Sequence, residues 1–472
     1  MRGPRGAVRR RDAPARRRAE ESRRPRAGQQ LTVTFRAMDP EGPATAPVGN
    51  HLVAVPFAIP GEEAVVRIVR GGDPARGRIA ALLRKSPQAA TPRCRHFGLC
   101  GGCQWQHLSD DAQRHYKVQL VRDVLARLLE GTAAEVLPAV GGGVWRYRNR
   151  LQAVFAVRRD RVVAGYHGGG EDRRVINIRE CPIQQAGNVA ALEAVREVVS
   201  RLRLPIYDHV AGGGLMRGVI VQGALATGET MIVLSATDDL PDRMEVVRAI
   251  REAVPGVTSL YLSVQPRHSA EPLGRVTLLW GRPYIEDEIA GLRLRLYPEP
   301  SLPPNPGAIP VWLEAIAAAL AVRSGDTVLD VACEDGLVPL WLASRAARVV
   351  GIAPTREAMH RAWEHAQING VHNCVFYTRA PERVTEKLRA RGERFDAAVV
   401  TSRRRPTSPE VFAALGGTGV RRLAVAGTSL RLLERDLWTA RAAGFAVTGI
   451  QPVDLLPQTS RVHCVVALRR AG

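Results

Sequence analysis

The amino-acid sequence predicts a multidomain protein with a small all-β barrel, a mixed α+β central domain and a C-terminal α/β domain of the doubly wound, Rossmann-like type. Three observations predict this class. Short strand-like segments separated by Gly and Pro come first, strand-like segments with few helices follow, and strands alternate with helices in the last part. With 472 residues and 45% hydrophobic content, the chain can build several cores.

The first 86 residues combine two kinds of sequence. Residues 1–28 contain eleven arginines, three acidic residues and no aromatic side chain. Such a segment cannot bury enough apolar surface to fold, so we expect a disordered basic arm. Residues 29–86 contain the runs QLTVTFRAM, HLVAVPFAIPG, EEAVVRIVRG and RIAALLRK, which are typical of the short strands of an OB-like barrel.

The cysteine pattern within residues 87–297 is the most specific chemical signal in the chain. Cys94, Cys100 and Cys103 form a C-x5-C-x2-C group, and Cys181 follows in the segment RECPIQ. Two glycines between the second and third cysteines permit a tight turn, so that both thiols can face one centre. Four thiolates suit an iron–sulfur cluster or a tetrahedral zinc ion. Four unrelated buried thiols are the alternative.

The remaining segments give the order of the central and C-terminal domains. Residues 110–131 have apolar side chains at helical spacing and predict a helix that can pack on the C-terminal domain. Runs such as NRLQAVFAV, GVIVQGAL and SLYLSVQ predict strands up to about residue 297, with one amphipathic helix at MEVVRAIREAV. From residue 298 a proline-rich segment leads into alternating strands and helices, which predict a doubly wound parallel sheet up to residue 472.

The charge of the chain favours an anionic partner. The net charge is +21 and the isoelectric point is about 10.8, and nucleic acid is the simplest partner for such a protein. An Arg-rich proteome is the alternative explanation. No stretch has the apolar length of a membrane span and no secretory signal is evident, so we expect a cytoplasmic protein with reduced cysteines and no membrane partner.

A collinear set of motifs resembles one enzyme family. These motifs are CGGCQWQH, WRYRNRLQ, VINIRECPI, GLMRGVIVQ, ERDL and VDLLPQTSRVHCVV. They resemble the S-adenosylmethionine-dependent RNA uracil-5-methyltransferases, which make 5-methyluridine in tRNA and 23S rRNA. The resemblance implies a TRAM barrel over 29–86, an iron–sulfur loop and a central RNA-binding region over 87–297, and a class I methyltransferase domain over 298–472.

The same resemblance implies cofactors and partners. The four cysteines would hold a 4Fe-4S cluster, with zinc as the alternative, and S-adenosylmethionine would be the methyl donor. The RNA partner would be a structured rRNA or tRNA. Arg146, Arg148 and Arg217 are candidate phosphate contacts, and a solvated face is the alternative explanation for these arginines.

Two catalytic positions depart from the family pattern. The family chemistry resembles base flipping, attack of a Cys thiolate at uracil C6, methyl transfer to C5, and removal of the C5 proton by a Glu. In this chain Thr428 stands at the position of the Cys and His463 at the position of the Glu. A hydroxyl is a much weaker nucleophile than a thiolate unless a base activates it, whereas an imidazole can accept a proton.

The positions that bind the methyl donor in the family are also changed. Asn305, Asp330 and Gly336 match the family pattern. The replacements are Glu334 at the first glycine of the nucleoside turn, Ala353 at the ribose acid, Arg379 at the adenine-side Asp, and Thr401–Arg404 at the D-P-P-R motif.

These replacements lead to one hypothesis and two alternatives. The hypothesis is an RNA-binding family member in which methyl transfer is weakened or lost. The first alternative is an active methyltransferase with a rearranged site that uses Thr428 or His463. The second is a zinc-stapled scaffold without an RNA role.

Overall fold

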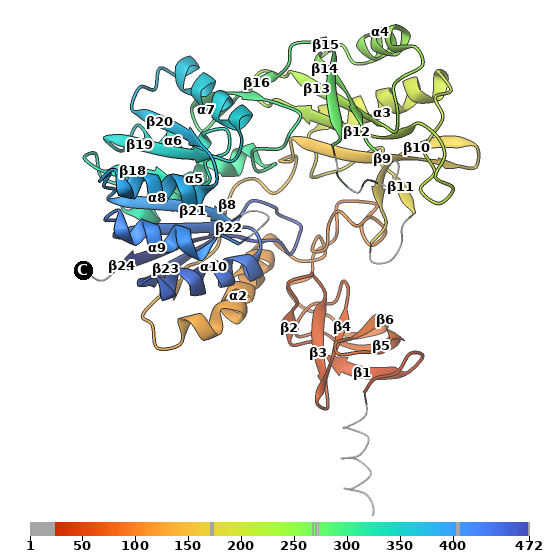
Figure 1. Ribbon diagram of the computed structural model, residues 1–472. Helices are drawn as coiled ribbons and strands as arrows, with labels where there is room; N and C mark the ends of the chain where they lie inside the picture. Colours follow the sequence, from red (N-terminus) through yellow and green to blue (C-terminus); the bar gives the residue numbers. More distant parts are fainter. Residues whose placement is uncertain are drawn as a thin grey trace, which may run out of the picture. The chain divides into compact units, whose positions relative to one another are not determined.

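The computed structural model describes residues 24–169, 174–266, 269, 271, 273–402 and 406–470 (Figure 1). Most of the basic arm predicted over residues 1–28 therefore lies outside the described residues. The chain forms two compact units. The first contains the chain up to Pro92 together with Gln104–Ala112, and the second contains Arg93–Cys103 and the chain from Gln113 onward. Within the described ranges, no helix is long and apolar enough to cross a membrane.

The first unit is built on a six-stranded sheet with the order β1-β5-β6-β4-β3-β2. Alternate residues of β5 point inward, and Ala64, Val66 and Ile68 are buried. Gly77 of β6 packs so closely that a Cβ atom there would lie 2.4 Å from a methyl group of Val66. The strands are β1 (Gln30–Thr34), β2 (Ala37–Met38), β3 (Ala44–Val48), β4 (His51–Val55), β5 (Glu63–Arg70) and β6 (Ala75–Arg84).

The helix predicted over 110–131 is present as α2 (Asp110–Leu129). Asp110 and Asp111 lie in its first turn and Arg127 in its last turn, so the charges complement the helix dipole. Val121 and Leu125 of α2 are fully buried.

The middle of the second unit is a seven-stranded sheet with the order β11-β10-β9-β12-β13-β14-β15. Two helices, α3 (Ala186–Arg201) and α4 (Arg243–Ala253), pack against each other, and α3 also contacts β9, β10 and β12. The sequence interpretation missed α3, which buries one apolar stripe centred on Leu192 and Val195. The strands are β9 (Arg150–Arg158), β10 (Arg161–His167), β11 (Val175–Asn177), β12 (Met216–Gly223), β13 (Thr230–Ala236), β14 (Val257–Val264) and β15 (Arg275–Gly281).

The C-terminal part of the second unit is the doubly wound sheet that the alternation predicted. Its strand order is β20-β19-β18-β21-β22-β24-β23-β7, with β8 paired to β23. The strands from β20 to β22 are parallel, whereas β24 runs antiparallel to both of its neighbours. The strands are β7 (Glu135–Val136), β8 (Val140–Gly141), β18 (Thr327–Asp330), β19 (Arg348–Ala353), β20 (Cys374–Thr378), β21 (Ala397–Ser402), β22 (Arg422–Gly427), β23 (Phe445–Asp454) and β24 (His463–Arg470).

Helices cover this sheet, and a hairpin precedes it (Figure 1). The alanine-rich helix α5 packs on β21, β22, β23 and β24, and α10 packs on β21, β22 and β23. The elements are β16 (Ile285–Ile289), β17 (Leu292–Leu296), η1 (Pro306–Ala308), α5 (Ile309–Leu320), α6 (Leu337–Leu342), α7 (Arg356–Ile368), α8 (Pro381–Ala390), α9 (Pro409–Gly417) and α10 (Leu430–Ala442). Strands β7 and β8 extend the sheet, although no strand was predicted there.

Candidate functional site

The strand order of the C-terminal sheet reverses at β18, which lies between β19 and β21. Open α/β sheets bind ligands outside the carboxyl ends of the strands at such a point. Asp330, the last residue of β18, is fully buried, and its Oδ1 accepts a hydrogen bond from the backbone N–H of Ala332 (3.0 Å). Gly336 has φ +91°, and a Cβ atom there would come within 2.9 Å of the Cβ of Ala362. Only glycine fits this start of α6.

The turn between Asp330 and Gly336 has the backbone shape of a glycine turn, although Glu334 stands at the position of the first glycine. Glu334 has φ +49°, which lies in the left-handed region that glycine adopts without strain. Burial, together with the carboxylates of Asp330 and Glu334, raises the pKa of Cys333 well above its usual value. The turn therefore presents negative charge where the family places a bare backbone.

The ends of the strands beside this turn hold the residues that the sequence places at the family's donor-binding positions. Ala353 ends β19 and is fully buried. Arg379 directly follows β20. The segment Thr401–Arg404 begins in β21, and only Thr401 and Ser402 of it belong to the described residues.

The two residues that the sequence places at the family's catalytic positions lie at the same edge of the sheet. Thr428 directly follows Gly427, the last residue of β22, and Gly427 pairs with Cys464 of β24. His463 is the first residue of β24 and is buried, with 8% of its surface exposed. The antiparallel register therefore brings a hydroxyl and an imidazole to neighbouring positions.

Asp436 of the ERDL motif fixes the chain after β21. Its carboxylate is fully buried on α10 and accepts hydrogen bonds from the hydroxyl of Ser402, the backbone N–H of Thr407 (2.9 Å) and the hydroxyl of Thr407 (3.2 Å). Burial raises the pKa of Asp436, and these hydrogen bonds oppose the shift. The sequence matched this motif to the family, and the structure gives Asp436 a positioning role.

The loop between β23 and β24 is held by side chains from distant segments. Lys117 is fully buried and forms an ion pair with Asp454. Gln458 has φ +69° and is 1% exposed. The anchors are Lys117 Nζ to Asp454 Oδ1 (2.5 Å) and Leu456 O (3.2 Å), Asn305 Nδ2 to Leu455 O (3.1 Å), Tyr147 Oη to Pro457 O (2.9 Å), and Gln113 Nε2 to Gln458 Oε1 (3.0 Å).

Sequence reasoning missed three of these anchors. Asn305 was predicted as a donor-binding residue, but Lys117, Gln113 and Tyr147 were not singled out. A lysine or glutamine on an amphipathic helix is usually solvated, so the sequence carried no signal for the buried positions of Lys117 and Gln113.

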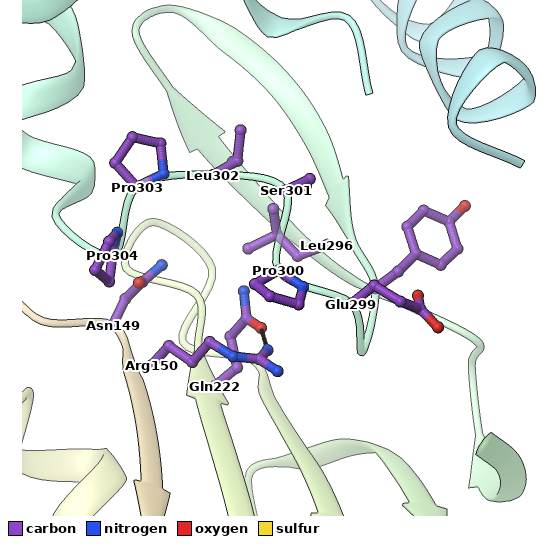
Figure 2. Close-up of a pocket in the computed structure, with 11 residues that line it drawn as sticks. Asn149, Arg150, Gln222, Leu296, Glu299, Pro300, Ser301, Leu302, Pro303 and Pro304 are labelled. Carbon is purple, nitrogen blue, oxygen red and sulfur yellow. Dashed lines mark hydrogen bonds between the residues drawn. The ribbon is translucent and has the colours of Figure 1, made fainter. Parts of the chain in front are cut away.

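A small pocket lies under the proline-rich segment that precedes Asn305 (Figure 2). Arg150 faces it and donates hydrogen bonds to Gln222 and to Pro298 O (2.7 Å), and burial lowers the pKa of Arg150 to about 10. Glu299 at the rim forms an ion pair with Arg361 (2.9 Å). The lining residues are Asn149, Arg150, Gln222, Leu296, Tyr297, Glu299, Pro300, Ser301, Leu302, Pro303 and Pro304.

The four predicted metal ligands all belong to the second unit, and among the described residues none of them forms a disulfide bond. Cys181 belongs to the core of the central sheet, and Cys100 and Cys103 pack against the same core. Burial raises the pKa of Cys100 and of Cys181, and electrostatic repulsion from Cys94 adds to both shifts. The thiols of Cys94, Cys100 and Cys181 are therefore close enough to repel one another, and soft sulfur donors suit an iron–sulfur cluster or zinc. Among the described residues, however, no group of three or more Cys, His, Asp or Glu side chains has the arrangement of a metal site.

The three predicted phosphate contacts have different surroundings. Arg146 Nη1 donates hydrogen bonds to Cys181 O (3.3 Å) and Gln184 O (3.4 Å), and Arg148 Nε donates to Arg150 O (3.2 Å). Arg217 is only 7% exposed, so a solvated face is the wrong explanation for this residue.

The switch point, the strand order and the antiparallel strand β24 define the fold of the S-adenosylmethionine-dependent methyltransferases. A solved structure with a similar chain fold is the tRNA (uracil-54, C5)-methyltransferase of Pyrococcus abyssi in complex with S-adenosyl-L-homocysteine. It is 21% identical, the match covers 93% of this chain and 99% of that chain, and the TM-score is 0.74.

Related sequences give the family. An uncharacterized RNA methyltransferase of Halalkalibacterium halodurans is 30% identical over 444 residues, which are 93% of this chain and 96% of the relative. One of Caldanaerobacter subterraneus is 30% identical over 448 residues, which are 94% and 98% of the two chains. No protein-family model matches the chain. The chain belongs to the RNA methyltransferase family, as the collinear motifs predicted.

Proposed function

We propose that this protein is an RNA-binding member of the uracil-5-methyltransferase branch, that it acts on a structured rRNA or tRNA, and that its methyl transfer is weakened or lost. One observation carries the proposal. The sheet has the strand order of a methyltransferase, while its carboxyl edge holds Glu334, Ala353, Thr428 and His463 at the positions that the resemblance makes functional. Without a ribose acid and a thiolate, both donor binding and attack on uracil lose their main groups.

The charge pattern of the first unit supports RNA binding. On strands β5 and β6, Arg67 is directly opposite Arg78, and Arg70 is directly opposite Arg76. All four side chains are exposed. Like charges directly opposite each other destabilise a sheet, and a phosphate backbone would offset this repulsion. Among the described residues, Arg67, Arg76 and Arg78 take part in no ion pair.

The neighbouring positions of Thr428 and His463 favour a second candidate, an active methyltransferase with a rearranged site. A hydroxyl needs an adjacent base to become a nucleophile, and the β22–β24 register supplies an imidazole at the next strand. Incubation with labelled S-adenosylmethionine and transcripts of 23S rRNA and tRNA would reveal this activity as labelled methyluridine.

We also propose that Cys94, Cys100, Cys103 and Cys181 hold a 4Fe-4S cluster, with zinc as the alternative, in a cytoplasmic protein. The proposal is supported by the electrostatic repulsion among the thiols of Cys94, Cys100 and Cys181, which come from two distant segments. Such a cluster would staple these segments, so its role here would be structural. Iron, sulfide and zinc analysis of anaerobically purified protein distinguishes the two metals.

The test of the main proposal is calorimetric titration of S-adenosylmethionine and S-adenosylhomocysteine into folded, metal-loaded protein. We expect no binding in the micromolar range. Micromolar binding would refute the loss of the donor site and favour the rearranged enzyme.

A further inference from the structure

The hairpin of β16 and β17 has an edge that is not covered by another strand. Among the strands that the structure describes, β17 pairs with β16 alone. The backbone groups of successive residues in a strand point to opposite edges. The N–H and C=O groups of one set of alternate residues therefore point away from β16, and they need partners from some other element.

Two side chains of helix α7 supply these partners. Asn369 Oδ1 accepts a hydrogen bond from the N–H of Arg293 (2.8 Å), and Asn369 Nδ2 donates to Arg293 O (2.8 Å). One helical turn earlier, His365 Nε2 accepts from the N–H of Arg295 (2.9 Å). Four residues of a helix and two residues of a strand both span about 6 Å, so the two spacings match. The helix therefore pairs this edge as a strand would.

His365 also contacts the turn after β18. Its side chain is buried, with 2% of the residue exposed, and its Nδ1 lies 2.8 Å from Asp335 O. A carbonyl oxygen only accepts hydrogen bonds, so Nδ1 must carry a proton. The N–H of Arg295 only donates, so Nε2 must carry none. His365 therefore joins the hairpin, α7 and this turn as a neutral imidazole.

The charged groups of the hairpin and of α7 near His365 are paired with one another. Glu364, the preceding residue of α7, forms an ion pair with Arg295 and accepts a hydrogen bond from Tyr297 Oη (2.6 Å). The guanidinium of Arg295 also pairs with Glu286 of β16 (3.0 Å). The carboxylate of Glu364 is therefore already engaged by a cation and a hydroxyl.

The turn brings further carboxylates to this place. Asp335 Oδ2 lies 4.0 Å from Nη1 of Arg361, which stands one helical turn before His365 on α7. Arg361 also pairs with Glu299 (2.9 Å). Glu334 precedes Asp335 in the turn and is the other acidic side chain next to it in the chain. The contact between the turn and the ring of His365 is made by the backbone oxygen of Asp335.

We propose that His365 is a proton-sensitive latch, which holds β17 on α7 while the imidazole is neutral and releases this edge of the hairpin when the imidazole takes up a proton. Histidine is the side chain whose ordinary change of charge falls between pH 5 and 8. A protonated ring donates from both nitrogens, so the N–H of Arg295 loses its acceptor. Nε2 can then bond only Arg295 O, which lies 3.2 Å away.

The neighbouring clamp does not respond to protons. The amide of Asn369 does not titrate, so the hydrogen bonds that it makes to Arg293 persist. Acid therefore opens one of two adjacent contacts and loosens the link between the hairpin and the turn that contains Asp335. This latch does not depend on whether the methyl donor still binds.

The test is amide hydrogen exchange of the whole protein, measured by mass spectrometry with fragmentation that resolves single amides, at about pH 8 and about pH 5.5. After correction for the intrinsic exchange rates, we expect protection of the Arg295 amide to fall by about ten-fold at the lower pH, because its N–H is left without an acceptor. The Arg293 amide should keep its protection.

His365→Gln should make protection of the Arg295 amide independent of pH, since a glutamine oxygen can accept the hydrogen bond and takes up no proton. His360→Gln is the matched control, because His360 is an exposed histidine of the same helix, and this variant should behave as the wild-type protein does.

The latch is refuted if the wild-type Arg295 amide is equally protected at both pH values, or if the Arg293 amide loses protection together with it. A folded His365→Gln variant that keeps the wild-type pH dependence would also refute it. If circular dichroism shows that this variant does not fold, the comparison of the two amides in the wild-type protein decides alone.

Discussion

The buried ion pair between Lys117 and Asp454 gives the sharpest test of how the site is built. Lys117→Ala leaves the carboxylate of Asp454, which is 4% exposed, without its cation. Breaking a buried pair by removing one partner costs about 3–5 kcal/mol. The substitution also removes the hydrogen bond to Leu456 O. We therefore expect the free energy of unfolding of the second unit to fall by about 3–5 kcal/mol.

The assay is urea unfolding followed by circular dichroism, with hydrogen exchange of residues 454–463 as the local measurement. Lys117→Met/Asp454→Leu is the matched control, because replacing both charges by apolar groups of similar size is often neutral. It should recover most of the stability. Exposed ion pairs contribute at most about 1 kcal/mol. If Lys117→Ala lowers the free energy of unfolding by less than this, the buried anchor is refuted.

Four further predictions concern the barrel unit, the cysteines and the active-site positions. Burial lowers the pKa of His107 from 6.5 to about 4, so the unfolded chain binds a proton at a higher pH than the folded protein does. The free energy of unfolding should therefore fall by up to about 3 kcal/mol as the pH drops from 6.5 to 4. His107→Gln should remove this dependence in acid unfolding curves. Cys100→Ser should eliminate bound iron and sulfide, while the buried Cys374→Ser control keeps them, and a variant that retains iron would refute the cluster. Thr428→Cys alone should yield no methylated uridine by mass spectrometry, because the donor site is altered as well, and any methylated uridine would show that the donor site works. Glu334→Gly should raise stability in thermal unfolding by about 1 kcal/mol, since φ +49° strains a residue with a Cβ atom, and a destabilised variant would contradict that strain.

The sequence predicted the regular parts of the fold because the spacing of apolar residues indicates which face of a helix or strand is buried. The alternation of strands and helices after residue 298 predicted the doubly wound sheet, and the spacing of apolar residues placed α2 to within two residues of its observed end at Leu129. It missed α3 because the run AGNVAALEAVREVVSR follows a cysteine-containing strand region and was not separated from it. It missed β7 and β8 because two-residue strands have no periodicity to detect.

The candidate site was less predictable, because buried polar contacts join segments that are far apart in the chain. Asp330 and Gly336 could be located from one turn motif. The roles of Lys117 and Gln113 could not, since each partner lies more than 300 residues away along the sequence. Arg217 is a further example, because a surface arginine and a buried, stacked arginine look the same in a sequence.

The residues that match the family motifs hold loops in place, and the residues that depart from these motifs do not. Asp436, Gln458, Asn305 and Tyr147 belong to matching motifs, and each is buried and bonds a loop in place. Replacing any of them would leave a buried polar group unsatisfied, at a cost of about 1–3 kcal/mol.

At the replaced positions the backbone, and not the side chain, holds the local structure. Ala353 ends a strand whose hydrogen bonds are made by the backbone, and Thr428 follows a strand whose register is set by Gly427 and Cys464. Glu334 keeps the left-handed turn although it is not glycine, because the residues around it dictate the backbone. The motif residues that anchor loops therefore contribute to stability, whereas Ala353 and Thr428 leave the hydrogen bonds of their strands to the backbone. The residues that match the motifs therefore determine the shape of the site, and the atoms at Glu334, Ala353, Thr428 and His463 determine its chemistry.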